Sequence, residues 1–281
     1  MAKRISSIGP IHAKRAVMTD ITSPDSLPLD GAETTDDCIL NGQIRVRQPR
    51  DGYRIGTDAI MLAATIQMKS GRLLDMGAGV GGVCLAVAHR LPGINITAVE
   101  IDPVSHHLLE HNIAQNEHAT RIRPLLADVL SLPPVMAGAF DNVVSNPPFH
   151  HYADSPARSR RRALAHYETD ERLRSWIDAG LAALKPKGRL SVIVRADRGD
   201  MILAHLREQG AGEIALFPLW SYQSSPAIRL VITARKAVKG VMALLPGLVL
   251  HNYSGALTQD AQKVMKGDGV LLIHPAASHL S

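Results

Sequence analysis

The tetrapeptide Asn146-Pro147-Pro148-Phe149 combines residue types that can hold a planar group bearing an amino group. An Asn side chain both donates and accepts hydrogen bonds, and a Phe side chain offers a flat apolar face. Two consecutive prolines stiffen the backbone and remove two amide donors, so that nearby carbonyls can accept from a ligand. The edge of an adenine or of a carboxamide would suit this set. Taken alone, the tetrapeptide is equally compatible with a turn whose Phe fills core space.

A glycine-rich loop lies upstream of the tetrapeptide. The apolar run Leu73–Met76 is followed by Gly77, Gly79 and Gly82 in the spacing G-x-G-x-x-G. Glycines allow a tight turn from strand to helix and a close approach of the backbone to a ligand. A single match to this pattern is a weak signal, but the predicted strand before it and the helix after it favour a nucleotide-type site.

Three carboxylates accompany the loop. Asp75 precedes the glycines, Glu100 closes the next predicted strand, and Asp128 follows the third. Glu100 could accept from the ribose hydroxyls of NAD or of S-adenosylmethionine, and Asp128 from an adenine amine. Asp75 would repel a pyrophosphate, whereas it suits the ammonium and sulfonium groups of S-adenosylmethionine. Each acid could instead cap a helix. Their joint placement favours the methyl donor.

The elements that must position these residues alternate between strand and helix. The expected strands are 72–76, 95–99, 122–126, 140–145, 189–194, 213–217 and 229–233, and the expected helices are 82–91, 104–116, 171–184 and 199–209. Such alternation predicts a parallel sheet with crossover helices, whose strands end together at the ligand-binding edge. The last two strands share a short link, so we expect antiparallel neighbours at one edge.

Three segments are predicted along the chain. Residues 1–38 lack periodicity and are expected to form a flexible arm, 39–236 the catalytic domain, and 237–281 an extension with no predicted place on the sheet. The domain is expected to open with a hairpin and a helix over 41–68. Its hairpin is expected within 41–54, with a turn after Pro49, and Thr57 or Asp58 is expected to cap the helix.

Composition limits the function classes. The net charge of +5 permits nucleic-acid binding, while an aromatic content of 4% argues against a long stacking surface for single strands. No apolar run is long enough to span a membrane. Cys38 and Cys84 lack the spacing of a metal site or of a disulfide framework, so we expect a cytoplasmic protein. His107 and His111 have no third ligand, so no metal is expected.

The order of these motifs resembles that of the S-adenosylmethionine-dependent methyltransferases that modify planar amino groups. The motifs are Asp75-x-Gly77-x-Gly79, Glu100, Asp128 and the tetrapeptide. The segment 52–62 is similar to the bacterial family that methylates N6 of an adenine in the anticodon loop of valine tRNA. The resemblance spans about residues 40 to 236, and 251–258 is similar to a C-terminal segment of some relatives. It implies a Rossmann-like α/β fold: a mostly parallel seven-stranded sheet, helices on both faces and an antiparallel edge strand.

The resemblance also implies roles for residues. Asn146 and the Pro147 carbonyl would accept from the target amine, and Phe149 would stack on the base. Pro148 completes the expected catalytic tetrapeptide. S-adenosylmethionine would be bound by Asp75, Gly77, Gly79, Glu100 and Asp128, with Thr57 and Asp58 nearby. The expected partner is RNA, with tRNA as the expected kind. Their position after the tetrapeptide, and not the resemblance, predicts that His150 and the cations Arg158, Arg160, Arg161 and Arg162 contact it; the alternatives are a solvated charged face for the arginines and a space-filling loop residue for His150.

Three alternatives stay open at this point. A protein glutamine side chain presents a carboxamide that suits the same acceptors, although such enzymes usually carry a helical substrate domain before the catalytic one. A non-catalytic RNA-binding module could keep the fold. A nicotinamide-dependent oxidoreductase is disfavoured by Asp75 and by the lack of a hydride-transfer constellation. The sequence does not indicate an oligomeric state.

Overall fold

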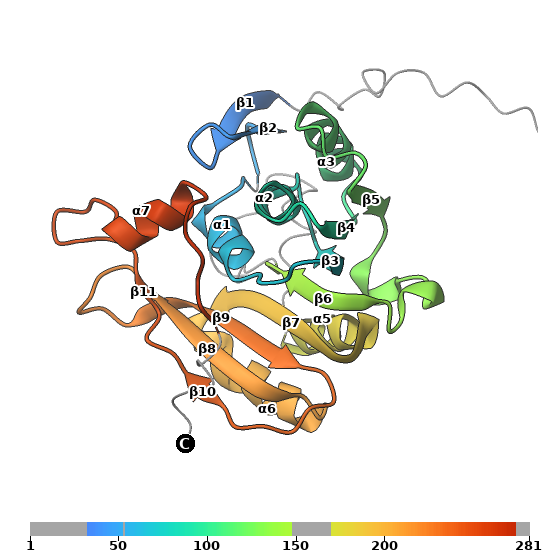
Figure 1. The fold of residues 1–281 in the computed structure, drawn as a ribbon, viewed down its shortest axis with the longest axis vertical. Coiled ribbons are helices and arrows are strands. Elements are labelled where there is room, and N and C mark those ends of the chain that lie inside the picture. Colours follow the sequence, from blue (N-terminus) through green and yellow to red (C-terminus); the bar gives the residue numbers. More distant parts are fainter. Residues whose placement is uncertain (1–32, 53, 148–169, 274–281) are drawn as a thin grey trace, which may run out of the picture. The chain divides into compact units, whose positions relative to one another are not determined.

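The computed structural model describes residues 33–52, 54–147 and 170–273, and its centre is a nine-stranded sheet (Figure 1). Along the sheet the order is β10-β8-β9-β7-β6-β3-β4-β5, and β11 pairs with β8. The strands are β3 (Gly71–Met76), β4 (Ile94–Glu100), β5 (Ile122–Leu126), β6 (Phe140–Ser145), β7 (Leu184–Arg195), β8 (Gly212–Trp220), β9 (Ala227–Arg235), β10 (Ala243–Leu244) and β11 (Leu248–Val249). All neighbours pair in parallel except β9, which is antiparallel to β7 and β8.

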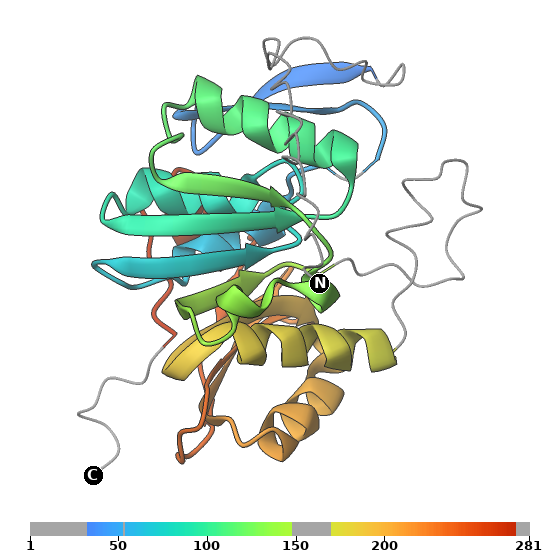
Figure 2. The ribbon, with the colours of Figure 1, turned by 90° about the vertical axis from the view of Figure 1, so that its right-hand side faces the viewer.

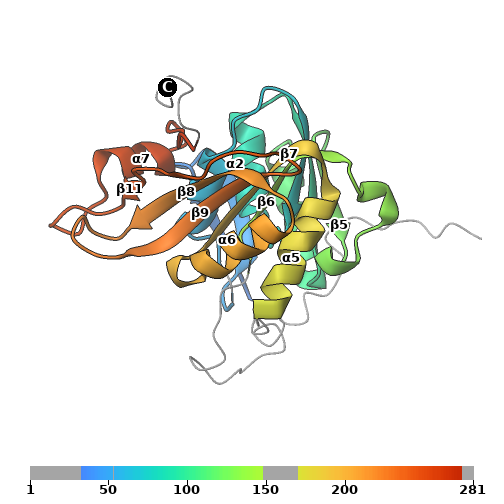
Figure 3. The same ribbon diagram turned by 90° about the horizontal axis from the view of Figure 1, so that it is seen from below.

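Helices cover both faces of this sheet, and Figure 3 shows α5 and α6 side by side on one of them. The helices are α1 (Thr57–Ala64), α2 (Gly82–Arg90), α3 (Pro103–Gln115), α5 (Asp170–Ala183), α6 (Gly199–Glu208) and α7 (Gln259–Met265), with short 3-10 turns η2 (Val129–Ser131), η3 (Pro134–Met136) and η4 (Ala196–Arg198). One apolar cluster joins α1, α2, α3 and α7 to one face, and the other cluster joins α5 and α6 to the opposite face. Strands buried on both faces account for the continuous apolar runs in the sequence.

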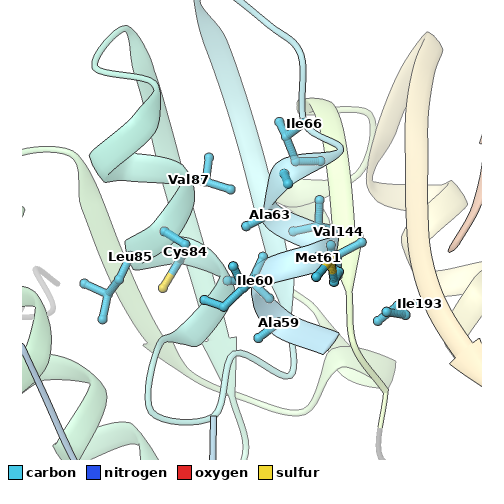
Figure 4. Packing of buried hydrophobic residues seen from close by; sticks show 14 of the residues in the cluster. Ala59, Ile60, Met61, Ala63, Ile66, Cys84, Leu85, Val87, Val144 and Ile193 are labelled. Atoms are coloured by element: carbon cyan, nitrogen blue, oxygen red, sulfur yellow. The ribbon is translucent and has the colours of Figure 1, made fainter. Parts of the chain in front are cut away.

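Helix α1 lies in the middle of the first cluster. Its residues from Ala59 to Ala64 are all buried. Figure 4 shows Ile60 and Ala63 of α1 beside Cys84 of α2, with Val144 of β6 and Ile193 of β7 on the sheet side. A helix that is apolar on nearly all sides has to be enclosed. Here α2, the sheet and α7 enclose it.

The predicted α/β fold class is confirmed, and the seven expected strands lie where the sequence places them. The predicted number of strands is wrong, because β10 and β11 bring the sheet from seven strands to nine. The antiparallel strand was expected at the edge of the sheet, and this position is wrong. The antiparallel strand is β9, which lies inside the sheet between β7 and β8. The reason is burial, because Leu230 to Ala234 form an unbroken buried run that an edge position would leave half covered. The outer side of β8 is then covered by β10, which pairs with Ala215 and Leu216, and by β11, which pairs with Leu219 and Trp220.

The hairpin lies earlier than expected. It consists of β1 (Thr34–Ile39) and β2 (Ile44–Pro49), so its turn lies between Ile39 and Ile44. The prediction of a turn after Pro49 is wrong. Asn41 and Gly42 adopt positive φ in this turn, which is the Asn-Gly signal for a hairpin. The strand therefore begins within the segment expected as an arm. Residues 1–32 lie outside the described part, and the domain boundaries stay a prediction.

Two further expectations are corrected. Neither Thr57 nor Asp58 caps α1, because the N-cap is Gly56 in an extended conformation with no side-chain hydrogen bond. The C-terminal extension does have a place on the sheet, through β10 and β11. Beyond them, α7 packs on α1, and the Leu271 amide donates to the Ala64 carbonyl at 3.0 Å. In the described part of the chain, every helix falls short of what a bilayer crossing requires.

Candidate active site at the carboxyl edge of the sheet

The parallel pairing brings four sequence-predicted positions to one edge. Met76 at the end of β3 lies opposite Val99 of β4 and Ser145 of β6, so Gly77, Glu100 and Asn146 follow at adjacent strand ends. Figure 2 shows the arrowheads of β3, β4 and β5 pointing the same way. Asp128 lies two residues beyond Leu126, the partner of Glu100. This is the edge where open parallel sheets bind ligands.

The glycine loop turns from β3 into α2 through left-handed backbone. Gly77, Gly79 and Gly81 have φ angles of 71°, 56° and 106°, and the amides of Gly77 and Ala78 both donate to the Val99 carbonyl at 2.9 Å. A Cβ atom on Gly77 would lie 3.0 Å from the Trp176 ring, whereas one on Gly79 would meet nothing within 4 Å. Gly79 is therefore the point of the loop where the backbone faces open space.

Glu100 fixes the shape of this loop. One carboxylate oxygen, Oε2, accepts from the Gly79 amide at 2.8 Å, and Oε1 accepts from the Ile101 and Asp102 amides at 2.9 and 2.8 Å. The side chain is buried, and burial raises its pKa although the three amides oppose that shift. A carboxylate offers about four acceptor positions. With three used, one acceptor position remains, and it is on Oε2, the oxygen that also binds the Gly79 amide.

Asp75 lies beneath the loop with 1% of its surface exposed. Its Oδ2 accepts from the Cys84 amide in the first turn of α2 at 3.0 Å. Burial, together with the neighbouring Glu100 carboxylate, raises the pKa of Asp75 to about 7. The carboxyl group thus changes charge near neutral pH. Because it is buried, we propose that it acts on a ligand cation through its field and not by direct contact.

The ends of β3 and β6 are tied together by a buried hydrogen-bond chain. The Trp176 Nε1 atom donates to Ser145 Oγ at 2.9 Å, and Ser145 Oγ donates to the Met76 carbonyl at 2.8 Å. The same Trp176 ring packs against Gly77. One side chain of α5 therefore aligns the glycine loop with Asn146. Sequence analysis missed both Ser145 and Trp176.

The tetrapeptide is described only in its first half. Asn146 is half-buried and Pro147 is buried. The remaining predicted residues lie outside the described part of the chain: Pro148, Phe149, His150, Arg158, Arg160, Arg161 and Arg162. Their roles stay predictions.

Asp128 is a helix cap, which is the alternative role that the sequence allows for each acid. Its Oδ1 accepts from the Leu130 amide at 2.9 Å and so caps η2. Contact between Asp128 and a ligand stays a prediction. Two large apolar side chains flank these acids, since Ile101 is 43% exposed and Leu130 is 37% exposed. Sequence analysis missed them, although an apolar residue directly after Glu100 and another two residues after Asp128 were the available signal.

The segment before α1 lies against the glycine loop. A Cβ atom on Gly82 would be 3.0 Å from Ile55, and the Ile55 amide donates to Gln48 Oε1 at 3.0 Å. Asp58 points elsewhere, because its Oδ2 accepts from Arg229 Nε of β9 at 2.7 Å. The predicted contact of Thr57 and Asp58 with the cofactor therefore has no support in this arrangement and stays a prediction.

Comparison with protein families settles the class of the chain. Residues 51–204 match the model of the methyltransferase small domain, which is more than half of the sequence. The chain belongs to the methyltransferase small domain family. Its methyl donor is S-adenosylmethionine, so the nicotinamide-dependent alternative is set aside.

Curated relatives of this methyltransferase share a name. The tRNA1(Val) (adenine(37)-N6)-methyltransferase of Haemophilus influenzae strain PittEE is 29% identical over 163 residues, which cover 57% of this chain and 69% of that protein. The enzyme of the same name from Histophilus somni strain 129Pt is 30% identical over 57% of this chain and 68% of its own length. The enzyme of that name from Porphyromonas gingivalis is 32% identical over 56% of this chain and 64% of its own length.

Solved structures confirm the fold. A predicted O-methyltransferase, Atu636 from Agrobacterium tumefaciens, superposes with a TM-score of 0.63 at 23% identity, over 76% of this chain and 98% of that one. The 16S rRNA N2 G1207 methyltransferase of T. thermophilus superposes with a TM-score of 0.50 at 18% identity, over 76% of this chain and 47% of that one. At these identities the likeness concerns the fold alone.

The geometry of the methyltransferase fits the donor. Glu100 Oε2 keeps one acceptor position beside its bond to the Gly79 amide, and we propose that a ribose hydroxyl donates to it. Ile101 and Leu130 offer apolar surface for a flat ring, and Asp75 supplies a negative field for a sulfonium and an ammonium group. We propose these residues as the donor site.

Proposed function

We propose that this methyltransferase transfers a methyl group to N6 of an adenine in RNA, and that its substrate is a tRNA methylated in the anticodon loop. The observation that carries the proposal is the place of Asn146-Pro147 at the end of β6, next to the glycine loop at the end of β3. The names of the curated relatives support adenine in tRNA as the acceptor.

Two acceptors in this place would do most of the chemistry that the protein must supply. The lone pair of N6 is delocalised into the adenine ring, so the amine is a weak nucleophile. When Asn146 Oδ1 and the Pro147 carbonyl accept its two protons, the lone pair can turn out of the ring plane. Positioning of this kind can lower a barrier by about 7–11 kcal/mol without a strong base.

S-adenosylmethionine supplies the methyl group on a positively charged sulfur that leaves as a neutral thioether. The N–C bond forms as the S–C bond breaks, and N6 then releases one proton to water. The chain's part is to hold the amine in line. In a tRNA loop the base can leave its stack at small cost. Phe149, from the family resemblance, would stack on the extruded base.

The acceptor is tested by incubating the full chain with methyl-labelled S-adenosylmethionine and, in separate reactions, total tRNA, ribosomal RNA and a release-factor-type protein. Each product is then digested and its labelled component is identified. We expect N6-methyladenosine from the tRNA reaction alone. Label in N5-methylglutamine would show that a carboxamide occupies the Asn146-Pro147 acceptors instead, and label in no substrate would favour a non-catalytic module.

A further inference from the structure

Two tyrosines and a histidine gather at the same edge of the sheet as the candidate site. Tyr222 lies in the link from β8 to β9, and His251 and Tyr253 follow β11. The parallel pairing of β11 with the end of β8 brings these links side by side, and the His251 amide donates to the Ser221 carbonyl at 3.0 Å. Figures 1 and 3 both show the end of β8 beside β11.

The loop that carries Tyr253 is held by its own hydrogen bonds. Asn252 Oδ1 accepts from the Ser254 amide, the Ser254 hydroxyl and the Ala256 amide at 3.0, 2.7 and 3.2 Å. At the base of the loop, Thr258 Oγ1 donates to the Val249 carbonyl at 2.7 Å. Tyr253 is nevertheless 83% exposed. An ordered loop therefore presents an aromatic ring to solvent.

The neighbouring pair of rings is also oriented. The Tyr222 and His251 ring centroids are 5.6 Å apart at an interplanar angle of 39°, and Tyr222 is 42% exposed. His251 Nδ1 lies 3.2 Å from the Ser221 carbonyl. Because a carbonyl only accepts, Nδ1 carries the proton and the ring orientation is fixed. Rings whose orientation is fixed in advance lose little entropy when a flat group stacks on them.

A row of strand ends connects these rings with Asn146. Next to β6 lies β7, which ends at Arg195, and Arg195 lies opposite Arg229 of β9. The ends of β8 and β11 follow. Since neighbouring strands are about 4.8 Å apart, the rings lie roughly 15–20 Å from the end of β6. The row thus runs from the acceptor site past Arg195, which is paired with Asp197, and Arg229, which is paired with Asp58, to the aromatic rings.

We propose that Tyr222, His251 and Tyr253 form a stacking platform for unpaired bases of the RNA that carries the target adenine. The inference rests on the proposed function and extends it to the substrate's flanking nucleotides. RNA loops are recognised by stacking their splayed bases on aromatic side chains. Exposed rings at the same edge of the sheet as Asn146, one of them in a loop held by its own hydrogen bonds, fit that mode of recognition.

Steady-state methylation of tRNA by Tyr253→Ala and Tyr222→Ala tests the platform. We expect the KM for tRNA to rise roughly 5- to 100-fold in each variant, the change that loss of one stacked base produces. Tyr253→Phe keeps the stacking face and should restore most of the affinity. Binding of S-adenosylmethionine should not change in either variant, and the thermal midpoint should not change in Tyr253→Ala, whose ring is 83% exposed.

Val135→Ala is the matched control, because Val135 is 84% exposed and η3 precedes β6 at the other edge of the sheet. Its KM should equal that of the wild type. If the wild type methylates tRNA and both tyrosine variants keep its KM, the platform is refuted and the proposed function stands. If the wild type methylates no RNA, the proposed function fails and the platform fails with it.

Discussion

Asp75 carries a charge that a bound cation can change. Its pKa is raised from 3.8 to about 7 by burial, so the folded protein binds one more proton than the unfolded chain between these pH values. This contribution to stability is complete below about pH 4 and is lost as the pH rises through 7. A cationic donor favours the ionised form. We therefore expect its affinity to fall as the pH drops below about 7, measured by calorimetric titration between pH 5.5 and 8.5.

The substitution Asp75→Asn separates the two effects. The amide oxygen can still accept from the Cys84 amide, while the cost of burying a charge disappears. At pH 8 we expect a higher thermal midpoint, by roughly 2–4 °C for each kcal/mol gained. We also expect weaker binding of S-adenosylmethionine, with a flatter pH dependence. An unchanged affinity for the donor would mean that the field of Asp75 does not reach it.

At Asn146 the expected effect is on chemistry and not on donor binding. Asn146→Ala removes the proposed acceptor of the target amine and leaves the hydrogen bonds of Ser145 and Trp176 in place. We expect the rate of methyl transfer to fall by at least about 100-fold, as a misplaced reactant does. The dissociation constant of S-adenosylmethionine should stay within about twofold. Loss of donor binding in this variant would contradict the role proposed for Asn146.

At the scale of elements, Asn112 of α3 joins the hairpin to the glycine loop. Its Nδ2 donates to the carbonyls of Arg47 and Val80, both at 2.9 Å, and its Oδ1 accepts from the Arg47 amide at 2.7 Å. Asn112 has no exposed surface. A buried amide with these partners fixes three elements at once, so the glycine loop depends on a helix and a strand that do not face the donor.

Asn112→Ala should therefore affect both stability and donor binding. We expect the free energy of unfolding to fall by about 2–4 kcal/mol, because buried backbone groups lose their partners. The affinity for S-adenosylmethionine should fall with it, since Val80 belongs to the loop. Asn116→Ala is the control: Asn116 binds the amide and carbonyl of Arg45 on the same strand but does not reach the loop. Equal donor affinity in the two variants would refute the coupling.

For the whole molecule, the C-terminal extension contributes to the core around α1. Ala261 and Val264 of α7 are buried in the first apolar cluster, and Gln67 Nε2 donates to the Leu271 carbonyl at 3.0 Å. A chain ending at residue 257 would uncover α1. We expect it to bind a hydrophobic dye and to melt at a lower temperature than the full chain. A truncated chain with an unchanged midpoint would show that α7 is only appended.

Local patterns in the sequence predict much of this fold. The strand 140–145 was predicted with the bounds it has, because its apolar run stops at Asn146-Pro147. Asn41-Gly42 carried an equally local turn signal that was overlooked. The hydrogen bond between Trp176 and Ser145 has no such signal, since it joins residues 31 positions apart. Asp128 shows a further limit: one carboxylate pattern fits both a cap and a ligand contact.

The two short strands beside β8 also bear on how the protein behaves in a crowded solution. β10 and β11 pair with β8 before and after Phe217 and Pro218, so these two residues form the gap between the short strands. Pro218 has no backbone amide that could pair with another strand there. At the other end of the described sheet, β5 carries Arg123 and Pro124. Exposed strand edges invite a strand of another chain, and charges and prolines discourage it. Both margins of the sheet are thus poor templates for aggregation.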